Sequence, residues 1–187
     1  MAQLKILLDT NSYFRLAKSV HPLLGEPFGD ENYCLYVLPE VDLELRRQPR
    51  LQSKFPWAGD EEFAEPRRKK PGMSRPQARE RKVVYDFLWD HVQNELPGPS
   101  PVDCTVLSYA SVLGIEVVTD DKDMRELADA FGIATLSTLQ LVKRMLDCGH
   151  IGMGEVRRIA AYWSYQDDRP RNYAKDYRRL FGEEAPP

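Results

Sequence analysis

The chain has 187 residues, of which 42% are hydrophobic and 29% are charged, and its formal net charge at pH 7 is -3. This length can bury a substantial core, and the composition is that of a folded domain rather than a disordered segment. The slightly acidic balance argues against a broadly basic nucleic-acid-coating protein, so any site for a polyanion must come from local charge.

The three cysteines, Cys34, Cys104 and Cys148, are widely spaced and form no Cys-x-x-Cys motif. This pattern argues against a zinc site or a disulfide framework, and we interpret all three as buried free thiols in a reducing compartment. The apolar run at the N-terminus is too short for a signal peptide, and no stretch approaches the roughly 20 apolar residues that span a bilayer. We therefore expect a cytoplasmic protein without a membrane partner.

Short apolar segments alternate with helical patterns along most of the chain. Residues 4–8 predict a buried strand, and the N-cap residues that follow predict a helix to about residue 18. A second strand is predicted at 33–38, and Pro39 suits the first turn of the next helix, which Pro49 should end. The later predictions are a helix at 83–92, a helix at 103–113, a strand at 115–118, a helix at 124–131, a strand at 133–136 and a helix at 137–146.

This alternation predicts an α/β fold in which helices cover both faces of a short parallel sheet of about four to five strands. We place this domain at residues 1–148. Within it, the charged stretch at about 58–82 turns from acidic to basic and is broken by prolines, which predicts an exposed, mobile inserted loop. Only helical patterns follow Gly154, so residues 149–187 are predicted to form a helical C-terminal extension.

Acidic residues gather at the predicted carboxyl ends of the strands. Asp9 follows the first strand, Glu40 or Glu44 lies just after the second, and Asp103 begins the helix that leads into the third. The third strand is followed by Asp120, Asp121 and Asp123. Because sites in parallel sheets form outside the carboxyl ends of the strands, we predict that carboxylates from these segments meet at one edge.

These acids predict a divalent metal site. Like charges held close together repel one another, and a cation removes that cost. An all-oxygen ligand set without clustered His or Cys favours Mg²⁺ or Mn²⁺ over zinc. Each acid also has a simpler explanation, because Asp9, Asp103 and Asp121 can each cap a helix and Glu44 can be a solvated helix residue. The hypothesis therefore depends on the acids meeting at one edge.

Ordered motifs across roughly residues 3–146 resemble the PIN-domain nuclease family. Leu7-Leu8-Asp9-Thr10-Asn11 is similar to the family's first motif, and Glu44-Leu45 is similar to its second. Asp103 with its small-residue helix resembles the third motif, and residues 117–124 resemble the Thr-x-Asp segment. The resemblance implies a PIN-like three-layer α/β/α fold and a metal-dependent endonuclease that usually acts on RNA. Many small relatives are toxins of toxin–antitoxin pairs, such as the VapC type.

The resemblance also implies roles for individual residues. Its catalytic and metal-binding acids would be Asp9, Glu44, Asp103 and Asp121, with Asp123 as an additional metal-binding acid. Asn11 and Thr119 would be polar supports. The Pro39-to-Glu44 spacing is one residue shorter than the family pattern, so Glu40 remains the alternative second acid. The basic insertion and the C-terminal helices also depart from the compact toxin pattern.

Two basic segments are candidates to hold a polyanion. The insertion offers contacts to phosphates through Arg67, Arg68, Lys69 and Lys70, with a solubilising loop as an equal alternative. Residues 157–179 mix arginines with Trp and Tyr, a combination that can stack bases. The simpler interpretation of this second segment is an amphipathic helix pair that packs on the domain or forms a homodimer.

We therefore expect a Mg²⁺- or Mn²⁺-dependent endoribonuclease that hydrolyses phosphodiester bonds in an RNA substrate. A toxin role with an antitoxin partner is the biological setting that the resemblance implies. The alternative is a non-catalytic PIN-like module that binds RNA or protein. An aspartyl-nucleophile phosphatase fits less well, because Asn11 stands where such an enzyme needs a second Asp.

Overall fold

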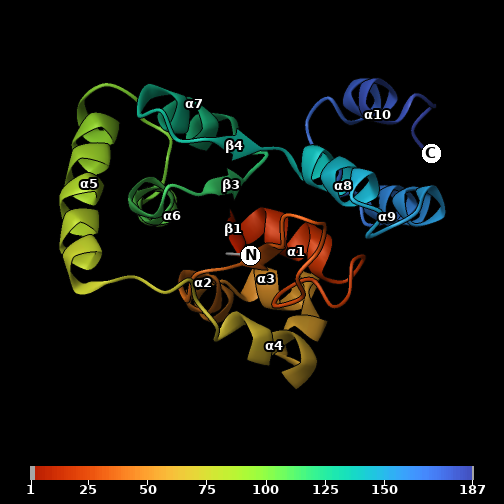
Figure 1. Ribbon diagram of the computed structural model, residues 1–187, viewed down its shortest axis with the longest axis horizontal. Helices are drawn as coiled ribbons and strands as arrows, with labels where there is room; N and C mark the ends of the chain where they lie inside the picture. The colour runs from red at the N-terminus through yellow and green to blue at the C-terminus, as the bar shows by residue number, and fades with distance from the viewer. Residues whose placement is uncertain (1–2, 187) are drawn as a thin grey trace.

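The chain forms an α/β fold around a four-stranded parallel sheet, as predicted. The computed structural model describes residues 3–186. The strands lie in the order β2-β1-β3-β4, and Figure 1 labels β1, β3 and β4 in that succession. Their bounds are β1 (Leu4–Leu8), β2 (Tyr33–Tyr36), β3 (Glu116–Val118) and β4 (Thr135–Leu136).

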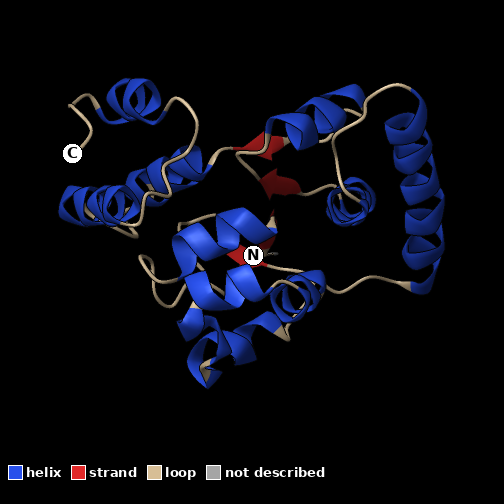
Figure 2. Cartoon of the chain, turned by 180° about the vertical axis from the view of Figure 1, so that it is seen from behind, coloured by secondary structure: helices blue, strands red, loops and turns tan. Residues whose placement is uncertain are grey.

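Helices follow each strand and complete the three-layer arrangement (Figure 2). The helices before β3 are α1 (Thr10–Ala17), α2 (Glu40–Arg47), α3 (Pro49–Lys54), α4 (Glu61–Arg67), α5 (Arg75–Asn94) and α6 (Pro101–Leu113), with a 3-10 turn η1 (Pro56–Gly59). The later helices are α7 (Lys122–Ala130), α8 (Thr138–Asp147), α9 (Met153–Tyr165) and α10 (Tyr173–Phe181). Within residues 3–186, no helix has both the length and the apolar character needed to cross a membrane.

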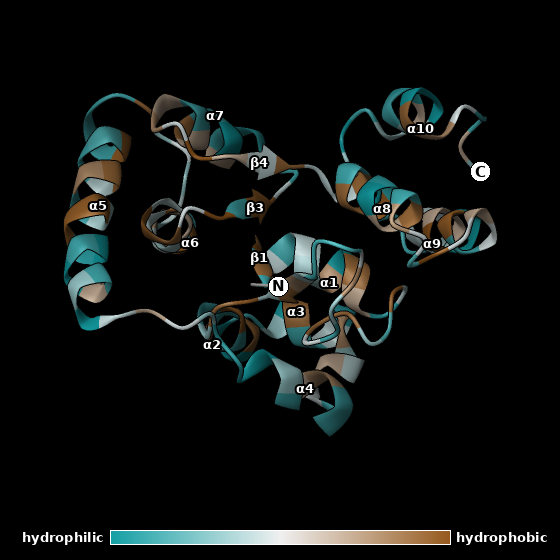
Figure 3. Cartoon of the chain, viewed as in Figure 1, coloured by the Kyte–Doolittle hydropathy of each residue, from teal (hydrophilic) through white to brown (hydrophobic). Residues whose placement is uncertain are grey.

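The sheet separates two hydrophobic cores, because successive side chains of a strand point to opposite faces. Ile6 and Leu8 of β1 and Val118 of β3 belong to one core, with α1, α8, α9 and α10. Leu7 and Val117 belong to the other, with α5, α6 and α7. All five of these strand residues are fully buried, which explains why β1 ends in three apolar residues and β3 in two. In the ribbon coloured by hydropathy, β1 is brown, and teal and brown residues alternate along the surrounding helices (Figure 3).

The parallel pairing brings the carboxyl ends of β1 and β3 to the same edge. Leu8 lies opposite Val118, and the ladder continues for one more residue because Asp9 N donates to Val118 O at 3.0 Å. The chain leaves β1 for β2 on one side and reaches β3 and β4 on the other. This reversal of strand order opens a crevice beyond the carboxyl ends, where parallel sheets usually bind ligands.

The stretch at 58–82 was predicted to be an exposed inserted loop, but it is largely helical. This stretch contains α4 and the first two turns of α5. Ser74 begins α5 with a capping box, in which Ser74 and Gln77 each accept from the other's backbone N–H. Pro49 was expected to end the helix after the second strand, and α2 does end just before it, at Arg47. Pro49 then begins α3, where its fixed φ suits the first helical position.

The C-terminal helices share the core of the sheet. Val156, Ile159 and Trp163 of α9 and Tyr177 of α10 are buried in the same cluster as β1. The Trp163 indole Nε1 also donates to the backbone carbonyl of Arg15 in α1 at 3.0 Å. Residues 149–186 therefore form part of one helical layer. Of the three free cysteines, Cys34 and Cys104 are buried as expected, whereas Cys148 is exposed.

Replacing Trp163 with alanine should test how far the sheet depends on this layer. The side chain is 1% exposed, so its removal should leave a cavity and lower the free energy of unfolding by about 3–5 kcal/mol. Tyr165 on the same helix is 84% exposed, and Tyr165→Ala should change stability by less than about 0.5 kcal/mol. Urea denaturation measures both. Equal losses in the two variants would contradict a shared core.

Candidate active site

The four acids that the resemblance singles out line one cavity at the carboxyl edge of the sheet. Its volume is about 220 Å³. Its acidic lining is Asp9, Glu44, Asp103 and Asp121, and the other lining residues are Thr10, Asn11, Gln48, Leu51, Ser100, Val102 and Val106. The acids arrive from the start of α1, from α2, from the first turn of α6 and from the start of α7. Elements distant in sequence thus bring carboxylates to one hollow.

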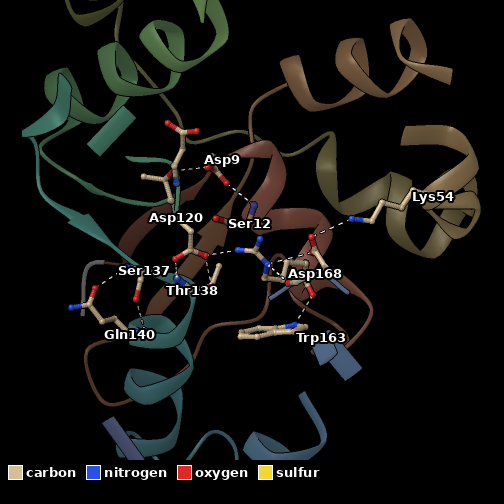
Figure 4. Close-up of polar contacts among 12 residues, drawn as sticks. Asp9, Ser12, Lys54, Asp120, Ser137, Thr138, Gln140, Trp163 and Asp168 are labelled. Carbon is tan, nitrogen blue, oxygen red and sulfur yellow. Dashed lines mark hydrogen bonds and ion pairs between the residues drawn. The ribbon is translucent and has the colours of Figure 1, made fainter. Parts of the chain in front are cut away.

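Asp9 is the buried member of the group. Asp9 is 5% exposed. Its Oδ1 caps α1 by accepting a hydrogen bond from Ser12 N at 2.6 Å (Figure 4). Its Oδ2 accepts from Thr119 Oγ1 at 2.5 Å. Burial raises the pKa of Asp9 to about 6, while the hydrogen bonds from Ser12 and Thr119 oppose that rise and the charge of Asp120 adds to it.

Thr119 connects two of the acids. Its hydroxyl is fully buried, donates to Asp9, and accepts from Asp121 N at 3.1 Å. Asp121 is exposed, and its Oδ1 caps α7 by accepting from Met124 N at 2.8 Å. The threonine therefore fixes the direction of the Asp9 carboxylate and holds the backbone of Asp121 beside it.

Asp103 occupies the first turn of α6. Its Oδ2 accepts from Ser100 N at 2.7 Å, and Ser100 Oγ accepts from Asp103 N at 3.1 Å. Burial raises the pKa of Asp103, the bonds to Ser100 oppose the rise, and the nearby carboxylates of Asp121 and Asp123 add to it. The charges of α6 and α7 therefore act on each other across the cavity.

Glu44 lies in the cavity, whereas Glu40 does not line it. The Glu44 Oε2 atom accepts from Thr10 Oγ1, which ties α2 to the start of α1. The Oε2 atom of Glu40 is buried without a hydrogen-bond partner in the described chain. Asn11 is exposed and lines the cavity. Asp123 stands outside the cavity lining and packs against the backbone of Gly98, where an added Cβ would lie 2.6 Å from its Oδ2.

The donor set suits an oxygen-binding cation more than zinc. The cavity is lined by carboxylate, hydroxyl and amide oxygens and by no Cys or His side chain within residues 3–186. Among the described residues, no three or more Asp, Glu, His or Cys side chains lie close enough together to hold a metal ion. Each carboxylate is instead held by its own local donor, as the hydrogen bonds of Asp9, Glu44, Asp103 and Asp121 show.

Asp120 does not line the cavity, and it belongs to a separate polar network (Figure 4). Its Oδ2 accepts from Arg15 NH1 and from Thr138 Oγ1, both at 2.5 Å. Arg15 Nε donates to Asp168 O at 2.9 Å, and Lys54 Nζ lies 3.2 Å from Asp168 Oδ1. No pattern in the sequence predicted this network, because Arg15 is separated from Asp120 and from Asp168, and Lys54 from Asp168, by more than a hundred residues.

Arg67 is a correction to the predicted nucleic-acid contacts. It is 3% exposed and donates to Asp42 Oδ1, to the hydroxyl of Tyr13 and to the carbonyl of Ala58. This arginine therefore holds α4 against α1 and α2 and is not available to a phosphate. Its predicted companions Arg68, Lys69 and Lys70 are exposed, and Arg68 pairs with Glu61.

The buried Asp9 should make stability depend on pH. Its folded pKa of about 6 lies above the ordinary value of 3.8, so its contribution to stability is full below pH 3.8 and is lost as the pH rises to about 6. In EDTA at pH 7.5, Asp9→Asn should therefore unfold with a free energy up to about 3 kcal/mol higher than the wild-type chain. Urea denaturation should show this gain shrinking toward pH 4.

Asp30→Asn is the control for that measurement, because Asp30 is exposed on a loop. It should leave the free energy of unfolding within about 0.5 kcal/mol of the wild type at both pH values. A lower stability for Asp9→Asn than for the wild type at pH 7.5 would show that the Asp9 charge stabilises the fold.

Comparison with known proteins does not assign the chain to a family. No protein-family model matches the chain, and no curated protein matches it.

Proposed function

We propose that the chain is a metal-dependent endoribonuclease that hydrolyses phosphodiester bonds at the acidic cavity. One observation carries the proposal: Asp9, Glu44, Asp103 and Asp121 come from four separate segments and line the same cavity of about 220 Å³. If these acids were helix caps and surface residues only, they would have no reason to share one hollow at the switch point of the sheet.

The choice of capping residues supports this reading. Helices α5, α6 and α8 begin with Ser74, Ser100 and Ser137, whose hydroxyls accept from the backbone without adding a charge. Among the described helices whose N-cap side chain accepts such a bond, only α1 and α7 use an aspartate. Both aspartates, Asp9 and Asp121, border the cavity. A neutral cap would serve these helices equally well, so the two negative charges call for another role.

Mg²⁺ or Mn²⁺ held by Asp9, Glu44, Asp103 and Asp121 would supply a bound water of lowered pKa and positive charge for the phosphate oxygens. The chain's own residues prepare the site. Thr119 orients the Asp9 carboxylate, and Asp123 adds negative charge behind Asp103. Asn11 lies at the rim, where its amide can contact a phosphate or a bound water. The buried Asp9 is favoured as an anion once a cation offsets its desolvation.

The proposal includes kinship with the PIN-domain nucleases. It is supported by the order of the motifs along the chain and by the parallel α/β sheet that displays them at one edge. A toxin role with an antitoxin partner, a cytoplasmic location and a homodimer remain predictions of the same kind. The insertion at about 58–82 and the C-terminal helices α9 and α10 depart from the compact toxin pattern, so they weigh against the toxin role more than against the chemistry.

Substitutions on α2 provide a matched test of the site. Glu44→Gln should reduce Mn²⁺-dependent cleavage of a fluorophore–quencher RNA by more than about 100-fold, because a cavity ligand is lost. Glu40→Gln, one helical turn away, should cleave at close to the wild-type rate. Asp9→Asn should abolish cleavage while circular dichroism shows an intact fold. If Asp9→Asn cuts RNA as fast as the wild type, the assignment is wrong.

The second candidate is a non-catalytic PIN-like module that binds RNA or protein. It is favoured by one observation, namely that the described acids are held by local donors and are not gathered into a metal-binding group. Calorimetric titration with Mn²⁺ separates the two candidates. The nuclease should bind Mn²⁺ below millimolar concentration and lose that heat in Asp9→Asn. An absence of binding at millimolar Mn²⁺ would favour the module.

A further inference from the structure

A second, larger cavity lies beside the acidic one. Its volume is about 400 Å³, and it shares the lining residues Asn11, Gln48, Leu51 and Asp121 with the acidic cavity. From this shared border it continues between α3, the first two turns of α1 and the segment that joins α9 to α10. We call it the basic groove, because its lining includes Arg15, Arg50, Lys54 and Arg171.

Two of these cations are occupied by carboxylates of the groove wall. Arg15 NH1 lies 2.5 Å from Asp120 Oδ2, and its Nε lies 3.4 Å from Asp168 Oδ2. Lys54 Nζ lies 3.2 Å from Asp168 Oδ1, and Figure 4 shows Lys54 and Asp168 pointing toward one another. These pairs join α1, α3 and the α9–α10 segment into one wall, so they build the groove rather than leave charge free for a ligand.

The other two cations are free to bind an anion. Arg50 on α3 and Arg171 after α9 are exposed, and neither has an ion-pair partner among residues 3–186. An unpaired guanidinium offers planar donors that match a phosphate. The groove therefore presents two available arginines directly beside a cavity lined by carboxylates.

We propose that the basic groove binds the phosphate backbone of the RNA on one side of the bond that is cut. This inference rests on the proposed function for the identity of the ligand and for the position of the cut. A carboxylate-lined cavity repels a polyanion, so the strand needs cationic contacts within a nucleotide or two of the reacting phosphate. Arg50 and Arg171 supply them from the lining of the groove, which adjoins the acidic cavity.

The basic groove is not the basic segment of the insertion that the sequence indicated as a phosphate contact. Lys69 and Lys70 are exposed, but they lie between α4 and α5 and line neither the acidic cavity nor the basic groove. A backbone contact there would lie outside both cavities. The two lysines therefore provide a charge-matched comparison, since their removal changes the net charge by the same amount.

RNA binding without metal tests the groove independently of cleavage. Anisotropy of a fluorescein-labelled single-stranded oligouridine would be followed in EDTA across a series of KCl concentrations. Arg50→Ala/Arg171→Ala should bind about tenfold more weakly than the wild type, and the slope of log K against log salt should fall by about 1.4 in magnitude, about 0.7 for each lost contact. Arg50→Lys/Arg171→Lys should restore most of the slope, because the charge is kept.

Lys69→Ala/Lys70→Ala should bind with close to the wild-type affinity and slope. The proposal is overturned if the arginine variant binds like the wild type, or if both double variants lose affinity equally. If the wild type cleaves RNA with Mn²⁺ while the arginine variant binds RNA as tightly as the wild type, the groove has no role in RNA binding. The proposed function would then still stand. If RNA binding depends on the two arginines but the wild type cleaves no RNA, the proposed nuclease activity is wrong. The groove would then be an RNA-binding site.

Discussion

The parallel pairing of β1 with β3 is the constraint on which the candidate site depends. It sets Leu8 opposite Val118, and the next residues, Asp9 and Thr119, therefore leave the sheet side by side. The backbone bond from Asp9 N to Val118 O extends the ladder to that point, and the hydroxyl of Thr119 then reaches the Asp9 carboxylate. A slip of one residue would move every strand side chain to the opposite core and separate this pair. The buried valines and leucines of both strands thus fix the geometry of the acids.

Burial of the Asp9 carboxylate lowers the stability of the fold, but the same carboxylate serves the proposed chemistry. Two hydrogen bonds favour its charged form, yet burial outweighs them and raises its pKa to about 6. A serine at this position would cap α1 without that desolvation cost, as serines do for α5, α6 and α8. Functional sites often retain such destabilising groups, because the group that strains the free protein is the one that binds the ligand. The same reasoning applies to Asp103, whose pKa is raised by burial and by neighbouring carboxylates.

The sequence predicted local structure well where a single segment determined it. The four strands, the caps Asp9 and Asp121, and the edge that these two acids share follow from apolar runs and from the order of strands and helices. Asp103 was also expected to cap a helix, but Ser100 caps α6 and Asp103 lies in its first turn, because the helix begins two residues earlier than predicted. Ion pairs between residues distant in the sequence could not be predicted from such local patterns. Arg67 looked like one of four equivalent basic residues, yet packing selected it for burial against Tyr13 and Asp42. Glu40 and Glu44 also could not be separated without knowing which turn of α2 faces the acidic cavity.

The C-terminal segment is better understood as a wall of the site than as an appendage. Trp163 anchors α9 to the carbonyl of Arg15, and Asp168 then accepts from the Arg15 side chain and pairs with Lys54. Arg15 in turn pairs with Asp120, the residue that follows Thr119. A continuous series of contacts therefore joins the C-terminal layer, through α1, to the same strand end that positions Asp9. The basic groove lies between α1, α3 and this segment, and it shares four lining residues with the acidic cavity. The C-terminal segment and the acidic cavity therefore belong to one connected surface, on which a ligand in the cavity can also contact the wall that the C-terminal segment builds.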